Sequence, residues 1–342
     1  MNPKTVIKGK IHYVGVNDRN KPRFEALWPL PYGVSYNSYL IDDEMVALVD
    51  TVDICYFEVY LRKIKQVIGE RPINYLIINH MEPDHSGSIR LIKQHYPEII
   101  IVGNKQTFGM IEGFYGVTGE QYLVKEGDFL ALGHHKLRFY MTPMVHWPET
   151  MMTFDETDGV LFSGDGFGCF GTVDGGFLDT RINVDKYWGE MVRYYSNIVG
   201  KYGSPVQKAL QKLGGLPISA ICSTHGPVWT ENIAKVIGIY DRLSRYDADE
   251  GVVIAYGSMY GNTEQMAEAI AEELSAQGVK NIVMHNVTKS HPSYIIADIF
   301  RYKGLIIGSP TYSNQIFPEV EALLSKILLR EVKGRYLGYF GS

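Results

Sequence analysis

The sequence predicts an α/β protein of two domains, and three observations carry that prediction. The chain has 342 residues, more than one ordinary hydrophobic core accommodates. Up to about residue 245, short apolar strands are separated by loops and several helices, whereas residues 251–342 alternate regularly between strands and helices. The polar stretch RYDADEG (245–251) separates the two patterns and is typical of a linker. We therefore expect one domain at residues 1–247 and a second at residues 251–342.

In the first domain, strands are predicted from apolar runs bounded by turn residues. NSYLID and MVALVDT flank the turn DDE and predict a hairpin. Further strands are expected at YLIINH, EIIIVG, KLRFYMTP, GVLFSGD and AICSTH. Residues 185–213 are expected to be helical, with a break near Gly200 to Pro205.

The second domain shows one strand–helix unit after another. Strands are expected at VVIAYGS, NIVMHNV, GLIIGSP and YLGYFGS, and helices from Thr263, through SYIIADIF and at FPEVEALLSKIL. This order predicts a doubly wound parallel sheet.

Composition excludes several classes of protein. Apolar residues make up 45% and charged residues 21% of the chain, and the formal net charge is −5. No stretch approaches the ~20 apolar residues of a membrane span, the N-terminus has no apolar secretion signal, and the acidic balance argues against nucleic acid. Cys55, Cys169 and Cys222 show no CxxC spacing, which argues against disulfides, a zinc finger or an iron–sulfur centre. We expect a cytoplasmic protein with neither a membrane nor a nucleic acid as partner.

The stretch NHMEPDHSGS (79–88) concentrates two imidazoles and two carboxylates in six positions. It begins where the apolar run YLII ends, and catalytic groups are common at the ends of strands. Pro83 and Gly87 disfavour a regular helix there, so we expect the side chains to splay around a centre. The four residues are His80, Glu82, Asp84 and His85.

Three more expected strands end in a possible metal ligand, namely His146, Asp165 and His225. Together with the first four, these residues make four histidines and three carboxylates. A single metal ion would need only three or four ligands. Seven ligands fit two ions that share a bridging group, and Asp165 is the natural candidate for the bridge.

These seven residues, in this order, resemble the metal set of the metallo-β-lactamase fold. The stretches YNSYLI, ALVDT, HWPET and SGDGFGCFG match the same family. The resemblance implies an αββα sandwich for the first domain. Hydrolases of that superfamily usually carry histidine where this chain has Glu82, and the glutamate variant is similar to the flavodiiron proteins.

A carboxylate in place of an imidazole adds negative charge and a hard oxygen donor, which suits redox iron better than hydrolytic zinc. The resemblance also implies that Asp50 orients a metal-ligating histidine. It implies the following ligand sets: His80, Glu82 and His146 for one iron, Asp84, His85 and His225 for the other, and Asp165 as the bridge.

The loop YGSMYGNTEQMAEAI (256–270) follows one strand and opens a helix. Hydroxyl, amide and backbone N–H groups at a helix N-terminus make an anion site suited to a phosphate monoester. The loop is neither a Walker loop nor a GxGxxG fingerprint, and a polar helix cap is the alternative. The candidate phosphate-binding residues are Ser258, Met259, Tyr260, Gly261, Asn262 and Thr263.

Two further loops complete a resemblance to the three FMN loops of flavodoxins. The first is GSPTYSNQIFP (308–318), in which Tyr312 could stack on the flavin ring, and the second is the terminal YFGS. The resemblance predicts a further helix and strand after Ser342, so we expect a flavodoxin-like module that is C-terminally incomplete. The candidate residues are Pro310, Thr311, Tyr312, Asn314, Phe340, Gly341 and Ser342.

The resemblance implies a flavodiiron oxidoreductase with FMN and two iron ions. A rubredoxin-type or other donor protein would reduce FMN, and electrons would pass to the diiron site, which would reduce dioxygen to water, nitric oxide to nitrous oxide, or both. The family implies a head-to-tail homodimer or a dimer of dimers. There are two alternatives: a dinuclear zinc hydrolase with an accessory flavodoxin-like domain, and an electron carrier with structural metals. The sequence does not decide which gas is preferred or which protein donates the electrons.

Two further histidines are adjacent in the sequence, as in a metal-affinity tag. His134 and His135 are expected to form a turn at the surface rather than a binding site.

Overall fold

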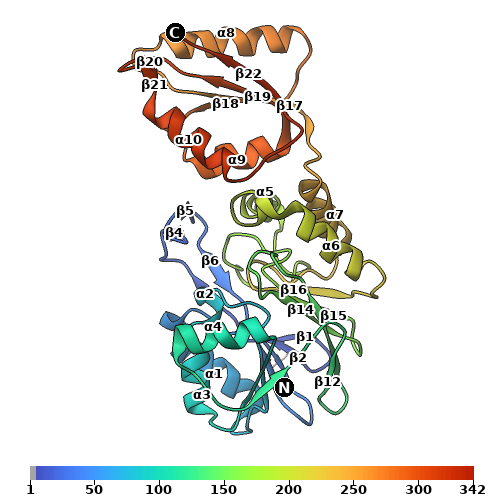
Figure 1. Cartoon of the computed structure of the whole chain (residues 1–342). Coiled ribbons are helices and arrows are strands. Elements are labelled where there is room, and N and C mark those ends of the chain that lie inside the picture. The colour runs from blue at the N-terminus through green and yellow to red at the C-terminus, as the bar shows by residue number, and fades with distance from the viewer. Residues whose placement is uncertain (1–4) are drawn as a thin grey trace. The chain divides into compact units, whose positions relative to one another are not determined.

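The computed structural model describes residues 5–342, which divide into two units. The first comprises the described residues up to Met191 together with Pro205–Gly238. The second comprises Val192–Ser204 and Ile239–Ser342. Figure 1 shows the course of the chain through both.

The first unit is built on two sheets. The larger has the strand order β1-β2-β7-β8-β9-β10-β11, antiparallel from β1 to β8 and parallel from β8 to β11. Its strands are β1 (Val6–Lys8), β2 (Ile11–Tyr13), β7 (Tyr39–Ile41), β8 (Ala47–Val49), β9 (Tyr75–Ile77), β10 (Ile100–Gly103) and β11 (Gln121–Leu123). The pairing of β7 with β8 confirms the predicted hairpin.

The second sheet has the order β12-β13-β14-β15-β16, and only the pair β15–β16 is parallel among its described strands. Its strands are β12 (Phe129–Ala131), β13 (Lys136–Met141), β14 (Met151–Asp155), β15 (Val160–Gly164) and β16 (Ala220–Ser223). Every residue of β14 and β15 is buried, which fits the continuous apolar runs of central strands.

Two short ladders lie outside these sheets. β3 (Val16–Asp18) pairs with β6 (Val34–Tyr36), and β4 (Arg23–Phe24) pairs with β5 (Trp28–Pro29). In the β4–β5 hairpin the amide of Leu27 donates to the carbonyl of Phe24 at 2.9 Å, and the two residues between them have φ of 49° and 58°. This is the pattern of a type I′ turn, here without glycine or asparagine.

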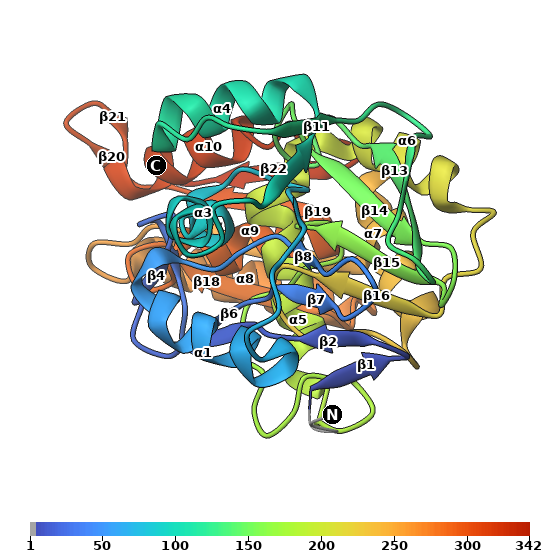
Figure 2. The ribbon, with the colours of Figure 1, turned by 90° about the horizontal axis from the view of Figure 1, so that it is seen from below.

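Helices follow the parallel strands of the larger sheet. They are η1 (Ile54–Tyr56), α1 (Phe57–Ile68), α2 (Pro83–Ser86), α3 (Ile89–His95) and α4 (Lys105–Tyr115). Because β8 to β11 run parallel in sequence order, right-handed crossovers put α1, α3 and α4 on one face of the sheet, as Figure 2 shows. Helix α1 buries an apolar stripe that includes Phe57, Tyr60 and Ile64.

Between β15 and β16 lie α5 (Asp185–Tyr194), the π-helical η2 (Tyr195–Val199), η3 (Gly200–Tyr202) and α6 (Gly203–Leu213), and α7 (Ile233–Ser244) follows β16. The change from α to π and 3₁₀ geometry over 195–202 accounts for the break expected near Gly200.

The core of the first unit lies between its two sheets. Ile41, Val49 and Ile77 from the larger sheet belong to the same buried cluster as Phe139 and Phe162 from the smaller one. Burial of each such side chain contributes about 1.5–3 kcal/mol, so this layer fixes how the strand ends of the two sheets meet.

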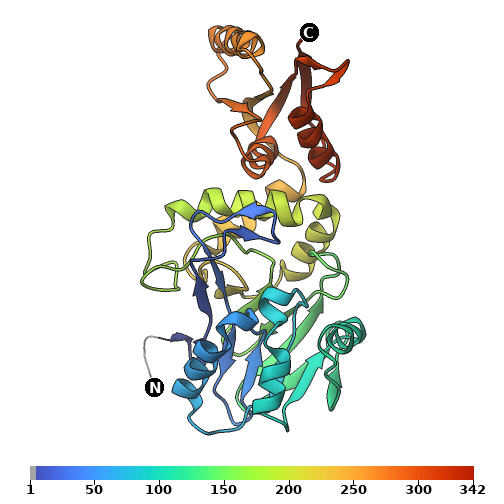
Figure 3. The same ribbon diagram turned by 90° about the vertical axis from the view of Figure 1, so that its left-hand side faces the viewer.

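The second unit holds a parallel sheet of order β18-β17-β19-β22. Its elements are β17 (Asp249–Tyr256), α8 (Asn262–Ala276), β18 (Ile282–Asn286), α9 (Pro292–Arg301), β19 (Tyr302–Gly308), the small hairpin β20 (Thr311–Tyr312) and β21 (Gln315–Ile316), α10 (Pro318–Leu328) and β22 (Tyr336–Phe340). Along β17, Val253 and Ala255 belong to one buried cluster and Ile254 and Tyr256 to another, so both faces of the sheet are covered. Figure 3 gives a second view of these elements.

Two local predictions were wrong. Pro83 does not prevent a helix, because proline is well suited to the first helical position, and Pro83–Ser86 form one turn that ends at Gly87. His135 is not in a surface turn: it is 1% exposed, and its Nδ1 lies 3.2 Å from Oδ2 of Asp155. The neighbouring carboxylate lets the imidazole be buried.

Among residues 5–342, no helix is both long and apolar enough to cross a membrane.

Candidate functional site

The stretch after β9 carries four of the candidate ligands. His80 and Glu82 lie in the loop that leaves the strand, and Asp84 and His85 lie on the single turn of α2. All four are buried: His80 and His85 are 0% exposed, Glu82 6% and Asp84 8%. The loop followed by a proline-initiated turn is what directs the four side chains to one region.

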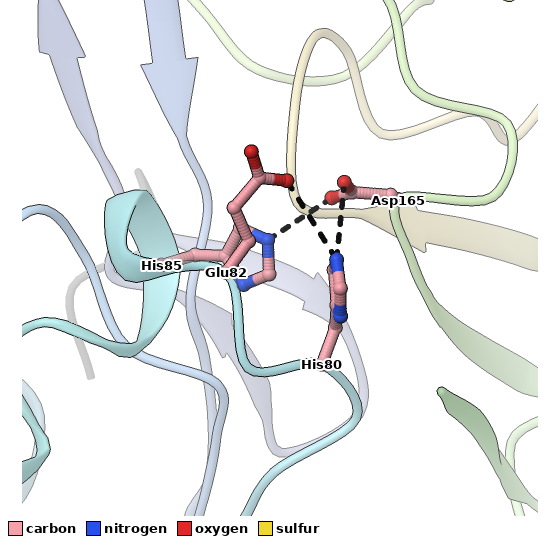
Figure 4. Close-up of side chains that lie close together, drawn as sticks. All are labelled: His80, Glu82, His85 and Asp165. Carbon is pink, nitrogen blue, oxygen red and sulfur yellow. Dashed lines mark ion pairs between the residues drawn. The ribbon is translucent and has the colours of Figure 1, made fainter. Parts of the chain in front are cut away.

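The second sheet supplies the other three. His146 lies in the loop between β13 and β14, Asp165 directly follows β15, and His225 follows β16. The structure brings all three together with the group from the larger sheet. Figure 4 shows His80, Glu82, His85 and Asp165, with the carboxylate of Asp165 facing both imidazoles.

The two oxygens of Asp165 face two different sets of ligands. Oδ2 lies 3.0 Å from Nε2 of His146 and 3.7 Å from Nε2 of His80. Oε2 of Glu82 lies 3.1 Å and 3.6 Å from the same two nitrogens, so these residues form one cluster.

On the other side, Oδ1 of Asp165 lies 3.2 Å from Nε2 of His85 and 3.5 Å from Nε2 of His225. Oxygens of Asp84 lie 3.6 Å and 3.3 Å from those nitrogens. The arrangement is therefore two clusters of two imidazoles and one carboxylate, joined by one shared carboxylate.

Hydrogen bonds behind the cluster fix which ring nitrogen points inward. Nδ1 of His80 lies 2.6 Å from Oε1 of Glu149, which also accepts from the amide of Met81 at 2.9 Å. Nδ1 of His225 donates to the carbonyl of Ser35 at 2.8 Å. Both rings consequently present Nε2 to the centre, in the tautomer that a metal ion requires.

Sequence reasoning missed Glu149 and assigned its role elsewhere. Asp50, expected to orient a ligating histidine, instead accepts from the backbone amide of Asn79 at 2.8 Å and from its side chain at 3.1 Å. It acts on the site by holding the residue before His80. The motif HWPET after β13 contains Glu149, but nothing in its spacing identifies the partner of His80.

The charges of the cluster shift its pKa values strongly. Burial alone would lower the pKa of His80, but its hydrogen bond with Glu149 and the nearby carboxylate of Glu82 raise it to about 9. Burial would likewise lower the pKa of His85, and the charges of Asp165 and Asp84 raise it to about 9. Burial would raise the pKa of Glu82, but its contacts with His146 and His80 lower it to about 2.

Several buried polar atoms in the centre lack hydrogen-bond partners, which a bound metal ion would provide. Nε2 of His80, Nε2 of His85 and both carboxylate oxygens of Asp84 are buried and have no partner with hydrogen-bond geometry. Buried polar atoms without partners are costly and rare in folded proteins, and coordination to a cation satisfies them. Imidazole with carboxylate is a donor set suited to iron, whereas structural zinc sites favour thiolate and imidazole.

The second unit places the first predicted flavin loop between β17 and α8. Gly261 has φ of 92°, and its amide donates to Oγ of Ser258 at 3.1 Å. A Cβ at Gly261 would meet no atom within 4 Å, so this face of the helix N-terminus is open. Thr263 is 6% exposed at the helix start, while Tyr260 is 91% exposed.

The other two predicted flavin loops meet at a cavity of about 580 Å³. The amide of Thr311 donates to the carbonyl of Ser342 at 2.9 Å, which joins the loops. Of the candidate residues, Tyr312 and Ser258–Thr263 are outside the described lining of this cavity. The lining is Ser309, Pro310, Thr311, Asn314, Gln315, Ile316, Tyr339, Phe340, Gly341 and Ser342.

Sequence reasoning missed four of those lining residues, Ser309, Gln315, Ile316 and Tyr339. Their only signal was the strand-end position of the two loops, because the β20–β21 hairpin that shapes the cavity has no strong local pattern. A cavity of this size is within the ordinary range for small-molecule sites.

The fold and the clustered ligands define a protein with a β-lactamase-like dinuclear metal domain and a flavodoxin-like domain. Residues 34–226 match a family described as ODP family beta lactamase, and residues 254–341 match Flavodoxin. The predicted fold class is thereby confirmed.

The chain belongs to the flavodiiron protein family. It is 32% identical over 342 residues to the anaerobic nitric oxide reductase flavorubredoxin of Vibrio vulnificus, covering 98% of this chain and 69% of that protein. The rubredoxin oxygen:oxidoreductase of Desulfovibrio gigas has a TM-score of 0.94 at 31% identity, covering 98% of this chain and 85% of that one. The flavodiiron protein of Giardia intestinalis has a TM-score of 0.93 at 28% identity, covering 97% and 81%.

Proposed function

We infer that this protein is an oxidoreductase that reduces dioxygen to water, nitric oxide to nitrous oxide, or both, at a non-haem diiron site supplied with electrons through FMN. One observation carries the inference. The two oxygens of Asp165 face two clusters of two imidazoles and one carboxylate, and one of those carboxylates is Glu82. Relatives named as a nitric oxide reductase and as a rubredoxin oxygen:oxidoreductase support both gases as substrates.

We propose that each cluster holds one iron ion. His80, Glu82 and His146 would bind the first, Asp84, His85 and His225 the second, and the carboxylate of Asp165 would bridge them. Short distances between the inward-facing atoms of each set, from 3.0 to 3.7 Å, support this assignment. A bound iron pair supplies reducing equivalents and open coordination positions for a small gas molecule.

The chain's own residues prepare this site. Glu149 and the carbonyl of Ser35 hold His80 and His225 in the ligating tautomer. The hydroxyl of Thr224 donates to Oδ1 of Asp165 and fixes the carboxylate between the clusters. Burial of the four imidazoles, of which the most exposed is His146 at 5%, keeps bulk water from the ligand atoms and strengthens their interaction with charge.

We propose that FMN binds at the carboxyl ends of β17, β19 and β22. The open helix N-terminus at Ser258, Met259, Tyr260, Gly261, Asn262 and Thr263 would receive the phosphate. The cavity lined by Pro310, Thr311, Asn314 and Phe340–Ser342 would receive the ring system. Tyr312, on β20 next to the lining residue Thr311, would stack on it. We place the diiron domain at 1–247 and the FMN domain at 251–342, supported by the matched ranges 34–226 and 254–341.

A dinuclear zinc hydrolase is not favoured. Glu82 is a charged oxygen donor where zinc hydrolases of this fold usually have a neutral imidazole. Hydrolysis moves no electrons, so the flavodoxin-like domain speaks against it as well. An electron carrier with structural metals is disfavoured as well, since structural sites rarely use seven ligands.

We propose a rubredoxin-type donor and a head-to-tail homodimer or a dimer of dimers, with no nucleic-acid or membrane partner. The name of the Desulfovibrio gigas relative, a rubredoxin oxygen:oxidoreductase, supports the donor, and the assembly rests on family likeness. The three free cysteines, two of them buried, support a cytoplasmic setting.

Metal analysis, a visible spectrum and gas electrodes test the proposal together. We expect two iron ions and one flavin per chain and consumption of oxygen or nitric oxide when a reduced donor is supplied. Zinc without flavin, and no consumption of either gas after reconstitution with ferrous iron and FMN, would contradict it.

A further inference from the structure

A carboxyl outside the seven ligands lies beside the candidate metal centre. Glu25 sits in the turn of the β4–β5 hairpin and is an exposed residue. The hairpin is anchored at the centre by Phe24, which is 1% exposed and packs edge-on against the ring of His225 at 5.3 Å. Phe24 also contacts Phe170 at 5.5 Å. The adjoining Glu25 is therefore held at the rim of the site rather than free at the surface.

The position of the Glu25 side chain is fixed by two local features. Trp28, its buried neighbour across the turn, donates from Nε1 to Oε2 of Glu25 at 3.0 Å. Glu25 and Ala26 both have left-handed backbone conformations, which are unfavourable for residues other than glycine, asparagine and aspartate. The hydrogen bond from Trp28 and this turn geometry together restrict where the Glu25 carboxyl can lie.

Charges from two other segments, the stretch after β9 and the loop between β13 and β14, act on this carboxyl. Burial, followed by the charge of Glu82, raises the pKa of Glu25 to about 7, and Asp84 adds to that rise. His146 and the hydrogen bond from Trp28 lower it. Among the described ion pairs, Glu25 joins none with a ligand, so it is coupled to the centre without belonging to it.

The proposed reaction consumes protons, which must reach the buried site from solvent. Reduction of one dioxygen to two waters consumes four protons with four electrons, and reduction of two nitric oxide molecules to nitrous oxide and water consumes two of each. The seven ligands cannot carry protons while they bind metal, and Glu149 is 0% exposed and bonded to His80. Glu25 is exposed to solvent and adjoins Phe24, which packs on the ligand His225, so its carboxyl is placed between solvent and the site.

We propose that Glu25 transfers protons from solvent to the oxygen released at the dinuclear site, directly or through one water. This inference rests on the proposed function. In the step, the O–H bond of the Glu25 carboxyl breaks as an O–H bond to the product oxygen forms. The carboxylate then regains a proton from solvent, and no electron moves through Glu25.

The test compares four variants of the full protein loaded with iron and FMN. Glu25→Gln keeps the shape and removes the transferable proton, so we expect kcat to fall by roughly 100-fold or more with little change in KM for the gas. Glu25→Asp should recover part of the rate. Glu112→Gln, at an exposed position of α4, is the matched control and should behave as wild type.

Trp28→Phe separates proton transfer from a structural role. It removes the donor that lowers the pKa of Glu25, so the alkaline limb of the pH–rate profile should move to higher pH while the plateau rate is kept. A measurement without turnover uses zinc-loaded protein: an infrared band of a protonated carboxyl should titrate with pH, disappear in Glu25→Gln and shift its midpoint upward in Trp28→Phe.

Wild-type turnover and pH profile in Glu25→Gln would overturn this inference and leave the proposed function intact. The same holds if the infrared titration is unchanged by Glu25→Gln. If the wild type consumes neither gas, the proposed function fails and this inference fails with it.

Discussion

Replacing Glu149 with glutamine is expected to weaken one of the two metal subsites and spare the other. Oε1 of Glu149 lies 2.6 Å from Nδ1 of His80, a charge-assisted contact in a fully buried place. Glutamine keeps the volume but removes the charge that makes His80 a stronger ligand. Loss of such a supporting group typically costs 10-fold to 100-fold in metal affinity, or about 1.4–2.8 kcal/mol.

A hydrogen bond to a charged group is independently worth about 1.5–3 kcal/mol, so the two magnitudes agree. Only the cluster of His80, Glu82 and His146 should be affected, because Glu149 contacts no imidazole of the other cluster among the described hydrogen bonds.

Anaerobic competition with a chelator, followed by metal counting, measures this effect. Glu149→Gln should release one of its two ions at a chelator concentration roughly 10-fold to 100-fold lower than wild type does, and the other at an unchanged concentration. Glu156→Gln is the control, since Glu156 pairs with Arg138 away from the imidazoles. Equal weakening of both ions, or no weakening at all, would refute the reasoning.

Three further predictions concern stability. Gly226→Ala should destabilise the first unit by several kcal/mol in denaturant unfolding, because φ is +82° and a Cβ would collide with Sγ of Cys169. Asn104→Ala should cost about 1 kcal/mol in the same assay, since its side chain caps α4 by accepting two backbone N–H groups. Burial lowers the pKa of His135, but the hydrogen bond and charge of Asp155, helped by other carboxylates, outweigh this effect, so the pKa is raised overall. The stability gained from charged His135 should be complete below about pH 6.5 and lost as pH rises through the folded-state pKa. His135→Gln should therefore lose more unfolding free energy near pH 6 than near pH 9, and an equal loss at both would contradict the assignment.

The sequence predicts well what depends on local pattern. The apolar runs that become β9, β15 and β16 end in polar residues, and strand ends of packed sheets converge, so their ligand candidates could be named without coordinates. The parallel order of the second unit follows equally from its alternation of strands and helices. The pairing β7–β8 follows from a turn signal between two apolar runs.

What the sequence does not predict depends on contacts between distant residues. Glu149 lies 69 positions from His80, and only the packing of the two sheets brings them together. The burial of His135 depends on Asp155, a partner on a neighbouring strand. The two-residue strands of the β4–β5 hairpin leave too little pattern to place Glu25 beside the metal centre.

The origin of the seven ligands has a consequence for assembly of the protein. Four come from the end of β9 in one sheet, and three from the ends of β13, β15 and β16 in the other. Each proposed ion therefore cross-links the two layers. Iron binding should stabilise the first unit against heat in proportion to its binding free energy. In iron-starved cells the metal-free protein should therefore unfold more often and be degraded sooner by proteases.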